Sequence, residues 1–191
     1  MNNYPIIAET LLTRVAVLPD VERIHSIIQS YVDPEAREIT LLPRTIPELS
    51  ENVRDFVVAE QDGKIVGCGA LHLYGMHLAE IRSIAVSRES KGRGVGRALV
   101  NALLQEAQRQ SVTCVCLFTR TPEFFARLGF QVAQREMLPD KIYKDCVTCP
   151  RLNDCNETAM VLGKIPTNAN SLRDPQIAIP LVKLPLVKIK G

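Results

Sequence analysis

The sequence lacks the long apolar runs that membrane proteins need. No stretch approaches about 18 uninterrupted apolar residues, so a membrane span is excluded. It also lacks an excess of one charge, since 23 Lys and Arg against 21 Asp and Glu leave a formal net charge of +2. Without a global basic field, nothing in the composition points to nucleic acid as a partner.

Signals for secretion are missing as well. The first residues, MNNYPIIAETLLTR, contain no basic segment followed by an apolar one, so we expect a cytoplasmic protein. Six cysteines in such a chain are expected to be thiols rather than disulfides. The 191 residues, 46% of them hydrophobic, fit one compact domain with some length to spare.

The order of periodic segments predicts a mixed α/β (α+β) fold. Strands are expected over residues 13–17, 56–60, 64–74, 80–86, 112–119, 130–135 and 158–162. Helices are expected after Asp20, over 45–53, after Gly96 and over 122–128. Asp62-Gly63 is a strong hairpin signal, so the second and third strands should pair antiparallel. The first half of the sheet is therefore expected to be largely antiparallel.

Residues 164–191 differ in kind from the rest. They contain four prolines and the near-repeat PLVKL and PLVKI, and they are more apolar than a solvated linker. We expect this tail to dock on a sheet edge of its own or a neighbouring subunit, the alternative being a flexible appendage. A homodimer that involves the tail stays open. The chain then divides into an extension (1–12), a domain (13–163) and the tail (164–191).

A glycine-rich turn links the strand at 80–86 to the following helix. Glycines at 92, 94 and 96 leave the backbone open to a ligand, and the free N–H groups at a helix start form an anion site. Basic residues at 88, 91, 93 and 97 surround it, so a pyrophosphate is the expected occupant. The alternative to an anion site is a tight turn whose charged side chains are solvated. The Walker pattern GxxxxGK[ST] is absent and the dinucleotide pattern GxGxxG fails at Leu99, which argues against both of those classes.

The wider stretch EIRSIAVSRESKGRGVGRALVNALLQEA resembles the acetyl-CoA-binding motif of the GNAT acetyltransferases. Lys91 stands where that family has Gln or Arg, which keeps the positive charge. The resemblance implies a GNAT fold, in which a central mixed, mostly antiparallel twisted sheet is flanked by helices and its central strands splay apart to hold acetyl-CoA. It also implies the cofactor-binding residues Ile84, Ala85, Val86, Lys91, Gly92, Arg93, Gly94, Val95, Gly96 and Arg97. Phe125 on the short helix that follows is a further candidate beside the cofactor, the alternative being a place in the core alone.

Further stretches are similar to the acetyltransferase domain of the N-acetylglutamate synthases, above all to their short stand-alone form. They are LLPRTIPELSENVRDFVVAE, AEIRSIAV, LFTRTPEFFARLGF, MLPDK and the cysteine-containing KDCVTCPRLNDCNETAMVL. The similarity covers roughly residues 13–163. It implies acetyl transfer from acetyl-CoA to the α-amine of L-glutamate by direct attack in a ternary complex, the first step of arginine synthesis. The alternatives are a GNAT acting on another small amine or amino acid, and a CoA-binding regulatory protein without catalysis.

The implied reaction needs a base and anchors for two carboxylates. The resemblance puts the base at Glu80, acting through a water. Arg44 and Arg120 match arginines of the synthases, and arginine forks suit carboxylates. Arg82 is a third candidate because it shares a strand face with Glu80. Each of these residues has a plain structural alternative as a surface charge or a loop side chain.

The reaction also needs a proton donor for the leaving CoA thiolate. Thr119 ends the strand that should splay from the one at 80–86, and we expect it to be this donor. Tyr143 is the second choice, because many GNATs use a tyrosine beyond the last helix. Thr119 as an ordinary strand residue is the alternative.

The cysteines fall into two groups. Those at 68, 114 and 116 lie in predicted strands and are expected to be buried. Cys146, Cys149 and Cys155 form a cluster of three thiols, and a tetrahedral zinc site would need a fourth ligand such as Asp145. We expect a reduced structural loop without metal, with zinc and a redox-sensitive thiol set as the alternatives.

Overall fold

The computed structural model describes residues 11–32, 41–149 and 152–165, and its centre is one seven-stranded sheet. The strands are β1 (Leu11–Val15), β2 (Phe56–Gln61), β3 (Lys64–Gly75), β4 (Leu78–Val86), β5 (Cys114–Thr119), β6 (Gln131–Val132) and β7 (Thr158–Gly163). The α-helices are α1 (Val21–Gln29), α2 (Ile46–Glu51), α3 (Val95–Arg109), α4 (Pro122–Ala126) and α5 (Pro139–Lys144). The strand order is β1-β2-β3-β4-β5-β7-β6.

Neighbouring strands run antiparallel except for the β4–β5 pair, which is parallel. The predicted mixed, mostly antiparallel sheet is therefore confirmed, and Asp62-Gly63 forms the turn between β2 and β3. β6 is shorter than predicted because its two residues are exposed at the sheet edge and pair with β7 alone. α5 was not predicted, since its six residues are too few to show a helical period.

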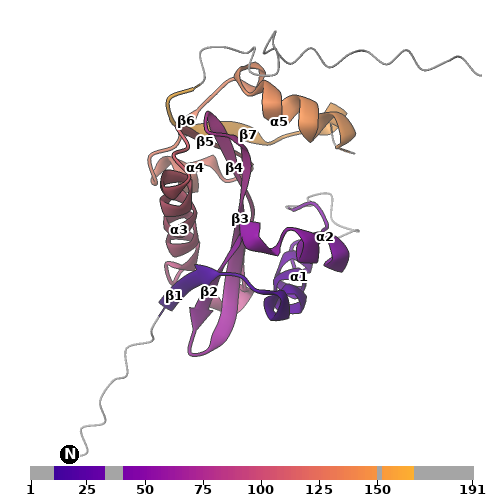
Figure 1. Cartoon of the computed structure of the whole chain (residues 1–191), viewed down its shortest axis with the longest axis vertical. Helices are drawn as coiled ribbons and strands as arrows, with labels where there is room; N and C mark the ends of the chain where they lie inside the picture. The colour runs from indigo at the N-terminus through magenta and orange to yellow at the C-terminus, as the bar shows by residue number, and fades with distance from the viewer. Residues whose placement is uncertain (1–10, 33–40, 150–151, 166–191) are drawn as a thin grey trace, which may run out of the picture.

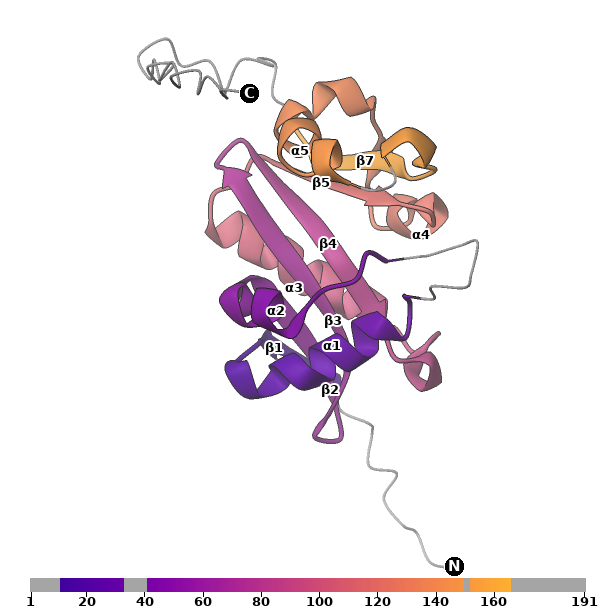
Figure 2. The same cartoon turned by 90° about the vertical axis from the view of Figure 1, so that its right-hand side faces the viewer.

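Helices cover both faces of the sheet (Figures 1 and 2). α3 packs on one face through a buried stripe made of Val95, Leu99, Val100, Leu103 and Ala107. α1 and α2 cover the opposite face beside β2 and β3, with Ile24, Ile28 and Leu49 almost fully buried. α5 lies on that same side, over β5 and β7.

The central strands β4 and β5 separate after a short contact. They pair at only two positions, Ala79 with Val115 and Glu80 with Cys116, and then diverge. A bulge at Ser83, where φ is +56°, shifts the register of β4 against β3. Because the bulge adds one residue, Ile84 packs on the α3 side of the sheet like Ile81. The predicted splay of the central strands is confirmed.

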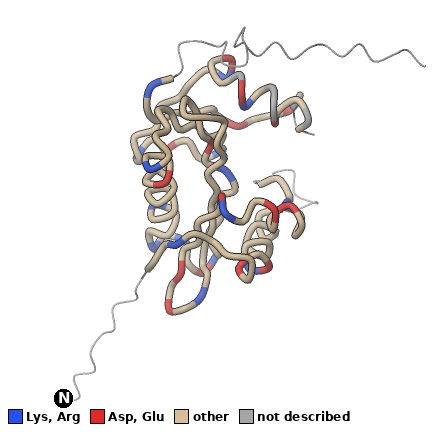
Figure 3. The backbone as a smooth tube through the Cα atoms, in the orientation of Figure 1, with Lys and Arg blue, Asp and Glu red and all other residues tan. Residues whose placement is uncertain are grey.

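β1 begins at Leu11, two residues before the expected domain boundary. Most of the expected extension and nearly all of the tail, residues 1–10 and 166–191, lie outside the described residues, and so does the expected docking of the tail. Basic and acidic residues are interspersed over the described chain, in keeping with its small net charge (Figure 3). Within this part of the chain no helix is long and apolar enough to cross a bilayer.

Candidate active site

The first cavity lies beside β4 at the N-terminal end of α3 and has a volume of about 520 Å³. The residues lining it are Tyr31, Ile84, Val86, Ser90, Lys91, Gly92, Gly94, Val95, Gly96, Arg97, Thr121, Phe124, Arg127 and Leu128. Eight of the eleven predicted cofactor residues are among them. Of the others, Ala85 is buried on the α1 side of β4, Arg93 is exposed in the turn, and Phe125 belongs to the core.

The backbone of the glycine turn explains why this cavity suits an anion. Gly92 and Gly94 have φ of +79° and +83°, a conformation that favours glycine. Gly94 is the N-cap of α3, and its carbonyl accepts the first helical bond, from Ala98 at 3.0 Å. The amides of the first turn therefore have no acceptor inside the helix. A Cβ at Gly96 would lie 3.3 Å from the Phe124 ring, so a small residue is also needed there.

Tyr31, which follows α1 in the chain, makes two contacts at this cavity. The Tyr31 hydroxyl donates a hydrogen bond to the carbonyl of Val86 at the end of β4. The Lys91 ammonium lies 4.9 Å from the centroid of the Tyr31 ring. Lys91 is thereby held between the first cavity and the second, since it lines both.

The second cavity, of about 310 Å³, lies where β4 and β5 diverge. Thr119 and Arg120 line it together with Phe125. Thr119 is 8% exposed, and its Oγ1 accepts a hydrogen bond from the Thr121 amide at 3.0 Å. Thr119 thus borders the opening between the two strands.

The third cavity, of about 230 Å³, is referred to below as the arginine pocket. It is lined by Leu42, Arg44, Arg82, Phe118, Arg135, Lys141, Asp145, Cys146, Cys149, Cys155 and Glu157. Arg82, Phe118 and Glu157 also line the second cavity, so the two spaces adjoin. The arginine pocket therefore opens toward the gap between β4 and β5.

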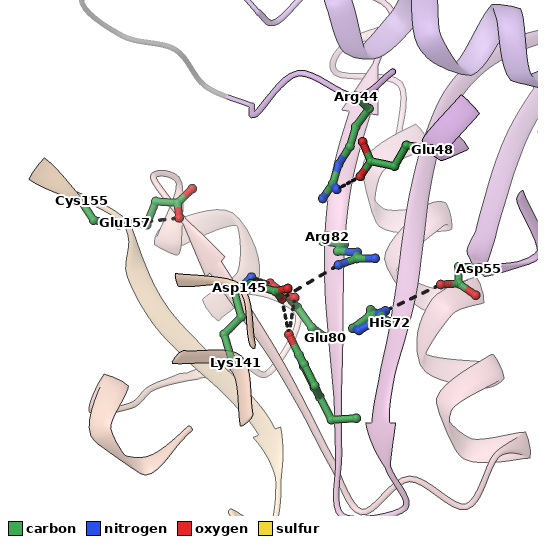
Figure 4. A network of polar contacts seen from close by, with 11 residues as sticks. Arg44, Glu48, Asp55, His72, Glu80, Arg82, Lys141, Asp145, Cys155 and Glu157 are labelled. Carbon is green, nitrogen blue, oxygen red and sulfur yellow. Dashed lines mark hydrogen bonds and ion pairs between the residues drawn. The ribbon is translucent and has the colours of Figure 1, made fainter. Parts of the chain in front are cut away.

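A polar network forms the floor of the arginine pocket (Figure 4). Lys141 Nζ lies 2.8 Å from Glu80 Oε1 and 3.2 Å from Asp145 Oδ2. The Tyr74 hydroxyl lies 3.0 Å from Glu80 Oε2 and 2.7 Å from Asp145 Oδ2. Arg82 Nη1 approaches Asp145 Oδ2 at 4.0 Å. Glu80 is only 3% exposed and lines none of the three cavities, whereas Asp145 and Lys141 lie above it on the pocket wall.

Burial and charge act together on the pKa values in this network. Burial lowers the pKa of Lys141, but the carboxylates of Glu80 and Asp145 raise it by more, so Lys141 is held as a cation. Burial raises the pKa of Asp145, while the Tyr74 hydroxyl, Lys141 and Arg82 lower it below its usual range. Burial and the two carboxylates both raise the pKa of Tyr74, which keeps its hydroxyl neutral.

The structure brings some of the predicted substrate residues together and separates others. Arg44 and Arg82 share the arginine pocket, and Arg44 also forms an ion pair with Glu48. Arg120 lies instead in the second cavity. Tyr143 belongs to α5, but its side chain is outside the described residues.

The residues of the site that sequence reasoning missed include Tyr74, Arg135 and Lys141, and Asp145 was considered only as a metal ligand. Lys141 was visible in the stretch MLPDK, which the family resemblance singled out. Tyr74 and Arg135 belong to no sequence motif that indicates a site. Only the fold brings Tyr74 to Asp145 and Arg135 to the pocket wall.

All six cysteines are free thiols. Those at 68, 114 and 116 are fully buried, as predicted, and burial raises the pKa of Cys68 to about 12 and of Cys114 to about 11. Cys146, Cys149 and Cys155 are half-buried on the wall of the arginine pocket. In the described part of the chain, no group of three or more His, Cys, Asp or Glu side chains is placed to hold a metal ion.

The cavity at the glycine turn and the adjoining one between the splayed strands β4 and β5 agree with a comparison to known families. The model of the acetyltransferase (GNAT) family matches residues 15–130. The chain belongs to the GNAT family. This acetyltransferase uses acetyl-CoA as its cosubstrate, and the solved relatives described next hold CoA.

Solved and curated relatives support the same assignment. An N-acetyltransferase of Chlorobaculum tepidum is 38% identical over 148 residues, which are 78% of this chain and 93% of that protein. An amino-acid acetyltransferase of Mycobacterium tuberculosis is 44% identical over 106 residues, 54% of this chain and 60% of the relative. The N-acetylglutamate synthase of Neisseria gonorrhoeae, complexed with coenzyme A and N-acetyl-glutamate, matches with a TM-score of 0.71 and 27% identity over 81% of this chain. The match spans only 35% of that synthase.

Proposed function

We propose that this acetyltransferase transfers the acetyl group of acetyl-CoA to the α-amine of L-glutamate. The observation that carries the proposal is the arginine pocket next to the gap between β4 and β5. Its wall has four cationic side chains, Arg44, Arg82, Arg135 and Lys141, against the carboxylates of Asp145 and Glu157. A surplus of cations suits a substrate with two carboxylates, and the acidic side chains suit its ammonium group.

The ammonium group must lose a proton before it can attack. With a pKa about two units above ambient pH, this costs roughly 3 kcal/mol. We infer that Asp145 receives the ammonium group and that Glu80 acts as the base behind it. Tyr74 connects the two carboxylates, at 2.7 Å from Asp145 and 3.0 Å from Glu80. The Tyr74 hydroxyl has one proton, so it can donate a hydrogen bond to only one of the two carboxylates. When the other carboxylate takes up a proton, it can donate a hydrogen bond to the Tyr74 oxygen in return.

The reaction then proceeds by direct attack. The free amine forms a bond to the thioester carbonyl carbon, and the C–S bond of the tetrahedral intermediate breaks to release the CoA thiolate. As the amide forms, the attacking nitrogen loses a further proton. We infer that Thr119 donates a proton to the thiolate and regains this one from the nitrogen, with Tyr143 as the alternative donor. A backbone N–H near Val86, where β4 ends, is the proposed donor to the oxyanion.

Relatives named amino-acid acetyltransferases support this substrate class. The chain spans 60% of the M. tuberculosis amino-acid acetyltransferase and 28% of the one from Neisseria meningitidis. A solved M. tuberculosis protein in complex with CoA and the ligand NLQ is covered over 99% of its length, with a TM-score of 0.68 and 31% identity. We place this reaction at the first step of arginine synthesis. Cytoplasmic location and a homodimer stay predictions.

A thiol-release assay with acetyl-CoA and a panel of amino acids tests the proposal. We expect L-glutamate to release CoA much faster than glycine or L-lysine, because neither offers a second carboxylate. Equal rates for the three amino acids contradict the proposal and favour another amine. Binding of acetyl-CoA without turnover on any amine would instead support a regulatory CoA-binding protein.

A further inference from the structure

The three thiols of the arginine pocket have no role in the proposed acetyl transfer. Cys146, Cys149 and Cys155 are half-buried on its wall, whereas the other cysteines lie fully buried in strands. They are therefore the thiols that a small molecule entering the pocket would meet.

Cys155 has the contact that matters for reactivity. Arg135 Nη2 lies 3.1 Å from Cys155 Sγ and donates a hydrogen bond to it. A guanidinium beside a sulfur stabilises the thiolate, which is the form that attacks electrophiles. Arg135 is held in place by a hydrogen bond to the carbonyl of Glu157 and by the Phe118 ring, whose centroid lies 5.4 Å from its guanidinium carbon. The Glu157 carboxylate, 3.9 Å from the sulfur, works against this effect.

The neighbouring thiol Cys146 differs in its surroundings. Burial raises the pKa of Cys146, and although Lys141 works against this, the nearby Glu80 and Cys155 raise it further. A raised pKa leaves less of Cys146 as the thiolate at neutral pH, which suits it to react in a second step.

We propose that Cys155 is a modification site for anionic low-molecular-weight disulfides, and that its modification blocks the arginine pocket. The four cations that line the pocket would attract a disulfide that carries carboxylates. The expected loss of acetyl transfer rests on the function proposed above, because it requires that the acceptor enters this pocket. The modification itself does not depend on that function.

The chemistry is thiol–disulfide exchange. The Cys155 thiolate attacks one sulfur of the disulfide RSSR, so that a Cys155–S–SR bond forms and one RS⁻ leaves. In a second step a thiolate of Cys146 or Cys149 attacks the Cys155 sulfur, which releases the second RS⁻ and leaves a disulfide within the chain. The disulfide RSSR is the oxidant and is reduced to two thiols, while two cysteines are oxidised.

The test uses the full chain and two probes at equal concentration, oxidised glutathione as the anionic disulfide and cystamine as the cationic one. Mass spectrometry of the intact chain and of its peptides reports which cysteine reacts. We expect Cys155 to react first, and faster with oxidised glutathione than with cystamine. Arg135→Met should slow the reaction about tenfold, since a charge-assisted contact to the sulfur is lost. Arg109→Met is the matched control, because Arg109 is exposed and pairs with Glu106 on α3, and it should leave the rate unchanged.

Three results would overturn the proposal. The first is that Cys155→Ser forms the same first adduct as the unchanged chain. The second is that Arg135→Met reacts with oxidised glutathione at an unchanged rate. The third is that oxidised glutathione and cystamine react at equal rates. Acetyl transfer is followed in parallel, with each sample compared with its own dithiothreitol-reduced form, and should fall in step with the adduct. If no amine is acetylated at all, the proposed function fails while the mass measurement still decides the modification.

Discussion

Replacing Lys141 with methionine removes the charge that bridges two carboxylates at the floor of the arginine pocket. The Lys141 side chain is 15% exposed and that of Glu80 is 4% exposed, so the change leaves a buried carboxylate without its cation. Breaking a buried ion pair in this way costs about 3–5 kcal/mol. Because Tyr74 still contacts Glu80 at 3.0 Å, we expect the lower end, about 3 kcal/mol. For a domain of this size the melting temperature should fall by about 6–12 °C.

Thermal and urea unfolding of the purified chain measure this effect, and a double-mutant cycle assigns it. Lys64→Met removes an exposed lysine at the β2–β3 turn and should change the free energy of unfolding by less than about 0.5 kcal/mol. Glu80→Gln combined with Lys141→Met should cost at least about 1 kcal/mol less than the sum of the single changes. Strict additivity of the two substitutions would refute the bridge between Lys141 and Glu80.

Three further predictions concern the cofactor, the acceptor and pH. Gly94→Ala should raise the KM for acetyl-CoA several-fold, because φ is +83° at the N-cap of α3. Gly63→Ala is the control, since Gly63 has a φ of +73° in a remote hairpin turn. Both changes should lower the free energy of unfolding by about 1 kcal/mol, and Gly63→Ala should leave the KM for acetyl-CoA unchanged. Arg82→Lys should raise the KM for L-glutamate about tenfold with little change for acetyl-CoA, and an equal effect on both would remove Arg82 from the acceptor pocket. The pKa of Asp145 is lowered in the folded chain, so its contribution to stability is present above its ordinary value of 3.8 and is lost as the pH falls through the folded value. Asp145→Asn should therefore flatten the acid limb of unfolding free energy against pH, and an unchanged slope would contradict this.

The fold could be predicted closely because local signals and family motifs agreed. The Asp62-Gly63 turn, the apolar, β-rich runs of the strands and the glycine turn before α3 each predicted the element that the structure contains. β6 and α5 were harder, since both are short and are defined by contacts with distant segments rather than by their own periodicity. The same dependence on distant segments limited the prediction of the candidate site.

The cofactor residues follow one another along β4 and the glycine turn, so a single stretch of sequence reveals them. The arginine pocket is assembled from the segment before α2, from β4, from β5 and from residues 135–157. No local pattern shows that Tyr74 at the end of β3 meets Asp145 at 2.7 Å. The burial of Glu80 beneath Lys141 was equally invisible, because it depends on how α5 lies across the sheet.

The central claim is that the arginine pocket recognises the second carboxylate of the acceptor. A competition of L-glutamate with L-glutamine at equal concentrations, with the acetylated products quantified by mass spectrometry, tests it most directly. The two substrates differ only by a carboxylate and an amide of the same shape, so we expect acetylated glutamate to exceed acetylated glutamine by about tenfold or more. Equal amounts of the two products, or an excess of acetylated glutamine, would contradict it.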